Sequence, residues 1–125
     1  MVQYFSKEFF DELAAALNVD AEWLKKTSSS AFKSIITITD RSKSFFLDVA
    51  GGKVAVTEVT PDVPADFKFE GPYEAWVILG KGEKDFQSLV MAGKVKFRGS
   101  MPKVMGLMGA WNRLIKVAQQ LPKEF

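Results

Sequence analysis

The sequence predicts a single α+β domain, because helical and strand-like patterns occupy separate stretches of its 125 residues. Apolar residues recur every three or four positions in residues 6–17, and they alternate with other residues between Ala31 and Glu70. Helical spacing returns after Pro72 and, apart from one short alternating segment, continues to about Leu121. A chain of this length buries roughly two thirds of its unfolded surface. We therefore expect residues 1–125 to form one domain with its own core.

Two helices are expected at the N-terminus. Ser6 is suited to cap the first helix, and Asp20 is suited to cap a shorter one that carries Trp23 and Leu24. The polar stretch at residues 27–30 ends this helical region. The apolar face of the first helix consists of Phe9, Phe10, Leu13, Ala14 and Leu17.

A run of three strands is predicted next, followed by a fourth strand after two prolines. The connections are of hairpin length, at residues 40–42 and at Gly51 and Gly52, so we expect antiparallel pairing and one sheet face in solvent. Pro61 and Pro64 interrupt the alternation before the fourth strand, which ends at Gly71. The residues expected on one face are Phe32, Ser34, Ile36, Ile38, Phe45, Leu47, Val49, Val54, Val56, Phe67 and Phe69.

Three helices and a fifth strand complete the expected architecture, whose sheet is mainly antiparallel. Gly93 is placed to end the second of these helices, and Ser100 is placed to cap the last. The elements expected are a helix after Pro72 ending at Gly80, a helix from about Glu83, a strand at residues 94–98, and a long helix from Ser100 to about Leu121.

The composition excludes much of enzyme chemistry. The chain has no histidine and no cysteine, which removes imidazole and thiolate nucleophiles and the usual zinc and haem ligands. No close pair of carboxylates stands out among its 15 acidic residues. We therefore expect a protein that is not an enzyme and that has no metal site and no cofactor. Glycine-rich nucleotide-binding motifs do not occur either.

The N-terminal segment does not resemble a secretion signal. Glu8, Asp11 and Glu12 interrupt its apolar residues, and no apolar run of about 18 residues or more occurs elsewhere. These features predict a cytoplasmic protein.

Positive charge is concentrated near the C-terminus. Residues 86–125 contain seven basic residues and one acidic residue, although the net charge of the whole chain is +2. Lys94, Lys96 and Arg98 alternate along the fifth strand and share one face, to which Lys103 is a possible addition. This face is either simply solvated or a contact for an anionic membrane or ligand head group. Nucleic-acid binding is not expected, because the alternation turns Phe97 to the opposite face.

The segment at residues 101–111 is apolar on two sides. Met101, Met105 and Met108 follow helical spacing on one side, while Val104, Leu107 and Trp111 lie on the other. Methionine clusters commonly fill gaps in a core, and their flexible thioethers also suit a pocket that accepts different apolar molecules. Both interpretations remain open at this level.

The order of elements resembles the sterol carrier protein type-two family of lipid-binding domains. Two segments carry the resemblance: residues 65–71, which lead toward Trp76, and residues 86–101, in which a helix ends in Ala-Gly-Lys before an alternating strand, a glycine and a polar cap. The resemblance implies helices covering one face of a five-stranded sheet, with a hydrophobic tunnel between the layers. It also implies binding of fatty acyl chains, acyl-CoA, sterols or other apolar ligands without catalysis.

These considerations predict non-catalytic carriage of a fatty acid, acyl-CoA, sterol-like or quinone-like molecule by a monomer or weak homodimer. The alternative is a protein-interaction module, or an accessory subunit of a lipid- or quinone-metabolising enzyme, that uses the same apolar helix. Lys94, Lys96, Arg98 and Lys103 are expected to contact a head group or, transiently, an anionic membrane. The tunnel is expected to be lined by Trp76, Leu79, Phe86, Leu89, Val90, Phe97, Met101, Met105, Met108 and Trp111.

Overall fold

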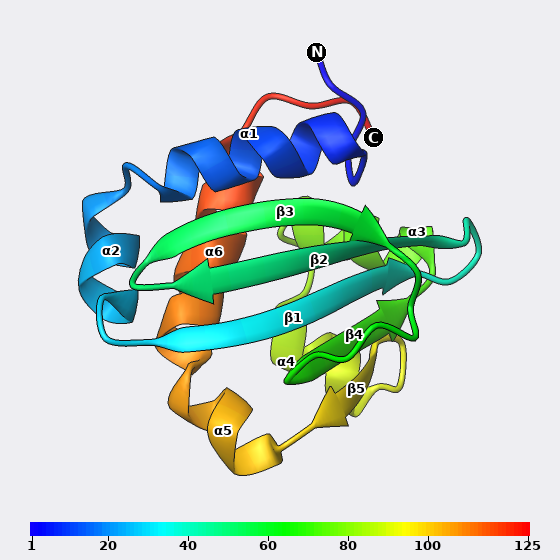
Figure 1. The fold of residues 1–125 in the computed structure, drawn as a ribbon. Helices are drawn as coiled ribbons and strands as arrows, with labels where there is room; N and C mark the ends of the chain where they lie inside the picture. The colour runs from blue at the N-terminus through cyan, green and yellow to red at the C-terminus, as the bar shows by residue number, and fades with distance from the viewer.

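The computed structural model describes residues 1–125 and has two layers, a five-stranded sheet and a set of helices behind it (Figure 1). The strand order is β3-β2-β1-β4-β5, which confirms the α+β class and the number of strands. The elements are α1 (Lys7–Leu17), α2 (Ala21–Thr27), β1 (Ala31–Ile38), β2 (Lys43–Ala50), β3 (Lys53–Val59), β4 (Phe67–Gly71), α3 (Tyr73–Gly80), α4 (Phe86–Met91), β5 (Lys96–Gly99), α5 (Met101–Gly106) and α6 (Met108–Gln120).

The sheet is mixed rather than purely antiparallel. Strands β1, β2 and β3 form the expected antiparallel meander, and β5 pairs antiparallel with β4, but β4 runs parallel to β1. The parallel pair arises because residues 60–66 carry the chain from the β3 edge past β2 and β1 before β4 begins (Figure 1). Gly51 and Gly52 make the tight β2–β3 turn with φ values of 57° and 84°, as a primed hairpin turn requires.

One side of the sheet, which we call the inner face, packs against the helices. It carries the expected alternating apolar residues of β1, β2 and β4, and these are buried. The opposite face is less exposed to solvent than the alternation predicts, because Ile35, Thr37 and Ser44 on that face are also buried. Phe46 and Lys68 flank Ile35 in the strand register, and the Thr37 and Ser44 hydroxyls hydrogen-bond each other at 2.8 Å.

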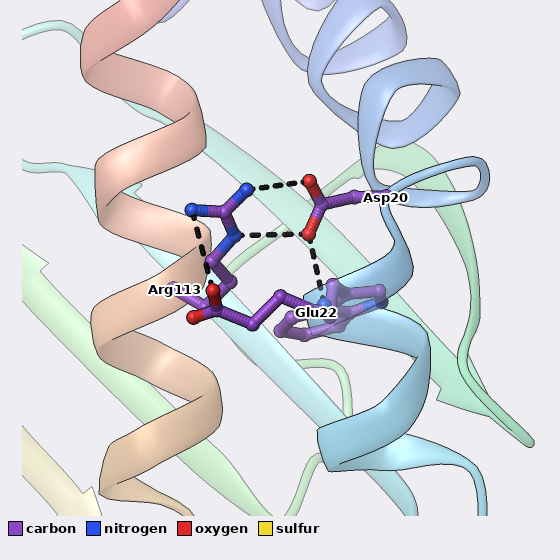
Figure 2. Close-up of polar contacts among 4 residues, drawn as sticks. Asp20, Glu22 and Arg113 are labelled. Carbon is purple, nitrogen blue, oxygen red and sulfur yellow. Dashed lines mark hydrogen bonds and ion pairs between the residues drawn. The ribbon is translucent and has the colours of Figure 1, made fainter.

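Both N-terminal helices begin at the expected caps. The Ser6 hydroxyl accepts a hydrogen bond from the Phe9 backbone N–H at 3.2 Å, and the Asp20 carboxylate accepts one from the Trp23 N–H at 2.8 Å. Asp20 also pairs with Arg113 of α6, whose guanidinium donates to both carboxylate oxygens at 2.6 and 2.9 Å (Figure 2). This bidentate pair holds α2 against α6 and lowers the pKa of Asp20, with the Arg113 hydrogen bond as the main cause.

The C-terminal elements differ in detail from the sequence-based expectation. The predicted long final helix is two helices, α5 and α6, separated at Leu107, whose φ of −106° and ψ of 8° leave the helical region. The preceding Gly106 weakens the helix at this point. The strand expected at residues 94–98 spans Lys96–Gly99, and the helix expected from about Glu83 begins after its cap, Asp85.

The longest helix, α6, has 13 residues, whereas about 20 are needed to cross a bilayer. No helix of the structure combines the length and apolarity of a membrane span.

Candidate functional site

An apolar cavity, here called the inner cavity, lies between the inner face of the sheet and helices α1, α3 and α6. It has a volume of about 40 Å³, and hydrophobic residues make up 13 of the 15 that line it. None of the lining residues carries a formal charge at neutral pH. The lining residues are Tyr4, Phe5, Phe10, Leu13, Ile36, Phe69, Trp76, Leu79, Gly80, Phe86, Trp111, Leu114, Ile115, Ala118 and Gln119.

Tyr4 brings a hydroxyl into this apolar wall. The hydroxyl donates a hydrogen bond to the Trp76 carbonyl oxygen at 2.8 Å, and burial raises the pKa of Tyr4, so the group stays protonated. Gly80 makes the close approach possible, because a Cβ at this position would lie 2.7 Å from the Tyr4 Cζ and hydroxyl oxygen. The terminal segments are thus tied to α3, and the two chain ends lie close together (Figure 1).

A second cavity, here called the outer cavity, lies among α4, β5, α5 and the start of α6. Its volume is about 130 Å³, and nine of its ten lining residues are hydrophobic. Met91, Met101 and Met105 are 87%, 51% and 52% exposed, so the thioethers form the rim where this cavity meets solvent. The lining residues are Phe69, Phe86, Gln87, Val90, Met91, Phe97, Met101, Val104, Met105 and Met108.

Phe69 of β4 and Phe86 of α4 line both cavities. Their rings meet nearly edge to face, with centroids 5.1 Å apart and an interplanar angle of 73°. Phe69 is buried in the sheet, whereas Phe86 is half-buried at the start of a short helix. The Phe86 ring is therefore the more movable part of the wall between the cavities.

Nearly all of the residues expected in a tunnel wall lie at one or both cavities. Phe86 lies at both, while Leu89 lies at neither and is fully buried in the core. Of the expected residues, the inner cavity is lined by Trp76, Leu79, Phe86 and Trp111. The outer cavity is lined by Phe86, Val90, Phe97, Met101, Met105 and Met108.

Several lining residues were not expected from the sequence. Phe10 and Leu13 belong to the predicted apolar face of α1, which is indistinguishable from ordinary core in a sequence. Tyr4 and Phe5 precede that helix and carry no periodic signal, and Phe5 adopts a φ of 55°, which brings its ring inward beside Trp76. Phe69 alternates correctly in its strand, but only the fold places it between the two cavities.

The four basic residues expected at a head group or membrane do not form one cluster. Arg98 pairs with Glu70 across the sheet at 3.2 Å, and Lys103 lines a separate surface hollow that also includes Asp66. Lys94 and Lys96 are exposed and take part in no ion pair. These two members of the expected set therefore remain without an acidic partner.

The site is thus an apolar space between a sheet and a helical layer, open to solvent at its methionine rim. A model of the SCP-2 sterol transfer family matches residues 10–112 of the chain. The chain belongs to this family, whose members are lipid-binding and lipid-transfer domains. No curated protein sequence matches the chain.

Solved structures share the fold at low sequence identity. A crystal structure of sterol carrier protein 2 superposes with a TM-score of 0.85 at 19% identity, over 96% of this chain and 100% of that one. The UbiJ-SCP2 ubiquinone synthesis protein gives a TM-score of 0.61 at 15% identity, over 90% and 88%. The sec-alkylsulfatase Pisa1 from Pseudomonas sp. gives 0.65 at 17% identity over 94% of this chain and 17% of that enzyme. The fold therefore occurs both alone and within a longer chain.

Proposed function

We propose that this chain binds and carries a long-chain apolar molecule, such as a fatty acid, acyl-CoA, sterol-like or quinone-like lipid, without catalysing a reaction on it. The observation that carries the proposal is the pair of apolar cavities that share the Phe69–Phe86 wall. Burying each methylene group contributes about 0.8 kcal/mol, so a long chain supplies ample driving force. Membership of the SCP-2 family supports the same function.

Uptake of such a molecule requires the cavity walls to move. Ligand pockets commonly measure about 300–1,000 Å³, and the cavities here measure about 40 and 130 Å³. Rotation of the Phe86 side chain would join them, and the flexible methionines of the rim would repack around the incoming molecule. We infer that the present conformation is closed.

Native mass spectrometry of the purified protein, followed by organic extraction, tests the proposal. A stoichiometric apolar molecule, or uptake of a fluorescent fatty acid by extracted protein, is the expected result. Met105→Arg places a charge at the rim and should reduce uptake at least tenfold while the domain stays folded. Val19→Arg is the control, because Val19 is also an exposed apolar residue, at 82% against 52% for Met105, and lines neither cavity. If the extracted protein takes up no apolar molecule, the proposal fails.

We also propose that the rim of the outer cavity contacts anionic membranes transiently. Three exposed methionines surround the opening, and the unpaired lysines Lys94 and Lys96 lie in the segment between α4 and the end of β5. Residues 86–112 contain no acidic residue. An apolar rim with nearby positive charge suits a surface that receives a lipid from a bilayer.

Vesicle co-sedimentation tests this contact. Lys94→Glu with Lys96→Glu should weaken binding to anionic vesicles at least tenfold, because each basic residue near such a surface contributes about 1 kcal/mol. Lys25→Glu with Lys26→Glu is the matched control at the end of α2. Equal loss in both double variants would mean that overall charge, and not this rim, determines binding.

A second function is favoured by the exposed methionines themselves. The rim could pack against a protein, which would make the chain an accessory module, and the fold likeness to the UbiJ-SCP2 ubiquinone synthesis protein is in keeping with this alternative. Size-exclusion chromatography at increasing concentration, with and without lipid, separates the two functions. A stable dimer that takes up no lipid would favour the interaction module, and a monomer that takes up lipid would favour the carrier.

A further inference from the structure

Two buried polar atoms have no hydrogen-bond partner within the chain: Nε1 of Trp111 and Oγ of Ser34. Their side chains are 4% and 0% exposed. Leaving a buried donor unpaired is costly, and such groups in a well-packed protein call for an explanation. The other buried polar side chains are paired: Trp23 Nε1 donates to the Gly52 carbonyl, Trp76 Nε1 to those of Gly71 and Thr37, Tyr4 to that of Trp76, Thr27 to that of Trp23, and Thr37 bonds with Ser44.

The two unpaired atoms belong to the same part of the core. Ser34 lies on the inner face of β1, two residues after Phe32 and opposite Phe67 of β4. The Trp111 ring lies against both phenylalanines, with centroid distances of 5.6 and 6.5 Å. Trp111 is also 5.2 Å from Phe69 and lines the inner cavity. Ser34 itself does not line the cavity, but it is the register partner of Phe67, one of the rings that the indole contacts.

We propose that Trp111 and Ser34 form a polar subsite that hydrogen-bonds an oxygen atom at the inner end of the bound molecule. The indole N–H donates, and the serine hydroxyl can donate or accept. This inference rests on the proposed carrier function and specifies its ligand class further. The preferred ligand is an apolar molecule whose buried end carries a hydroxyl, ketone, ester or quinone oxygen.

The subsite favours a neutral oxygen over a carboxylate. No charged side chain lines the inner cavity, so an ionised group there would be buried without a counter-ion. Burying an unpaired charge costs far more than burying a neutral, hydrogen-bonded oxygen. A fatty acid would therefore leave its carboxylate outside, at the methionine rim, and place only its hydrocarbon tail inside.

Competition binding with a methyl ketone and an alkane of equal chain length tests the proposal. Each compound displaces a fluorescent lipid, which gives a dissociation constant for each. The readout is the dissociation constant of the alkane divided by that of the ketone, so that a loss of affinity common to both compounds cancels. We expect a ratio that favours the ketone in the native protein. Trp111→Phe, which keeps an aromatic ring and removes the N–H, should lower this ratio about five- to tenfold, as loss of one hydrogen bond predicts. Ser34→Ala should lower it less.

Trp23→Phe is the control, because Trp23 is also a buried tryptophan but lines neither cavity, and its N–H is already paired with the Gly52 carbonyl oxygen. Its ratio should stay at the native value. An unchanged ratio in both Trp111→Phe and Ser34→Ala would overturn the proposal and assign the two atoms to buried water or to each other. If neither compound binds, the carrier function itself fails, which is a different result from equal binding of both.

A second measurement requires no variant. The three tryptophans give three indole N–H signals in a ¹H–¹⁵N spectrum. The ketone should move the Trp111 signal downfield while the alkane does not, and identical spectra with both ligands would overturn the proposal.

Discussion

Replacing Phe86 by alanine should convert two cavities into one. The Phe86 ring lines both spaces and stands edge to face against Phe69, which is fixed in the sheet. Its removal opens a path from the methionine rim to the inner cavity. A bound acyl chain could then extend further than in the native protein.

The magnitudes follow from the burial of the ring. A buried Phe→Ala substitution costs about 3–5 kcal/mol, and since Phe86 is half-buried we expect the free energy of unfolding to fall by about 2 kcal/mol. Each additional methylene that the ligand buries contributes about 0.8 kcal/mol, or about fourfold in affinity. An extension of about three methylenes would thus strengthen binding of the longest ligands about 50-fold.

Displacement of a fluorescent lipid by saturated fatty acids of increasing length is the assay. Affinity for the native protein should stop rising once the chain fills the accessible space, and the Phe86→Ala variant should continue to gain affinity at longer lengths. Leu89→Ala is the matched control, because it creates space in the same helix at a residue that lines neither cavity. The same limiting chain length in Phe86→Ala and the native protein would refute a dividing role for this ring.

Other substitutions test the fold around the site. Asp20→Asn retains a capping oxygen but removes the charge that Arg113 binds. Because the pKa of Asp20 is lowered in the folded state, the ionised carboxylate stabilises the fold above about pH 4, and this stabilisation is lost as the pH falls further. The free energy of unfolding should therefore fall less steeply with acid in the variant than in the native protein. Gly80→Ala forces a methyl group against Tyr4 and should cost about 1–3 kcal/mol in chemical denaturation, with unchanged stability contradicting the close approach. Gly109→Ala, where a methyl group meets nothing closer than 3.8 Å, should instead stabilise the protein by up to about 1 kcal/mol, and a loss there would contradict the helical geometry of α6.

The features that the sequence predicts well depend on local interactions. Ser6 and Asp20 cap their helices because a side-chain oxygen reaches an N–H three residues later, whatever the rest of the fold does. Gly51 and Gly52 make the expected turn for an equally local reason, since both require positive φ. The family resemblance, based on residues 65–71 and 86–101, added the arrangement of layers that local patterns leave open.

The features that were missed depend on distant contacts or on breaks in regular structure. The helical pattern continues through Leu107, so periodicity alone predicts one long helix where the chain forms α5 and α6. The parallel pairing of β4 with β1 depends on where residues 60–66 cross the sheet, which alternation does not encode. Tyr4 and Phe5 reach the inner cavity through the fold of the terminal segment and not through any pattern.

The division at Phe86 also separates two chemically different environments. The outer cavity has an exposed methionine rim, and the exposed Lys94 and Lys96 lie in the segment between α4 and the end of β5, two elements that line this cavity. The inner cavity has no charged residue in its lining, which includes Trp111 with its unpaired indole N–H. A fatty acid keeps its carboxylate outside, at the rim, and forms no hydrogen bond with the Trp111 indole. Its affinity should therefore depend on the two lysines and not on Trp111. A neutral ketone or quinone satisfies the second, so its affinity should depend on Trp111 and not on the lysines. Variants of the two lysines should therefore weaken binding of the fatty acid but not of the ketone or quinone, and variants of Trp111 should do the reverse. If both ligand classes showed the same order of sensitivity to these variants, the cavities would act as one uniform apolar space.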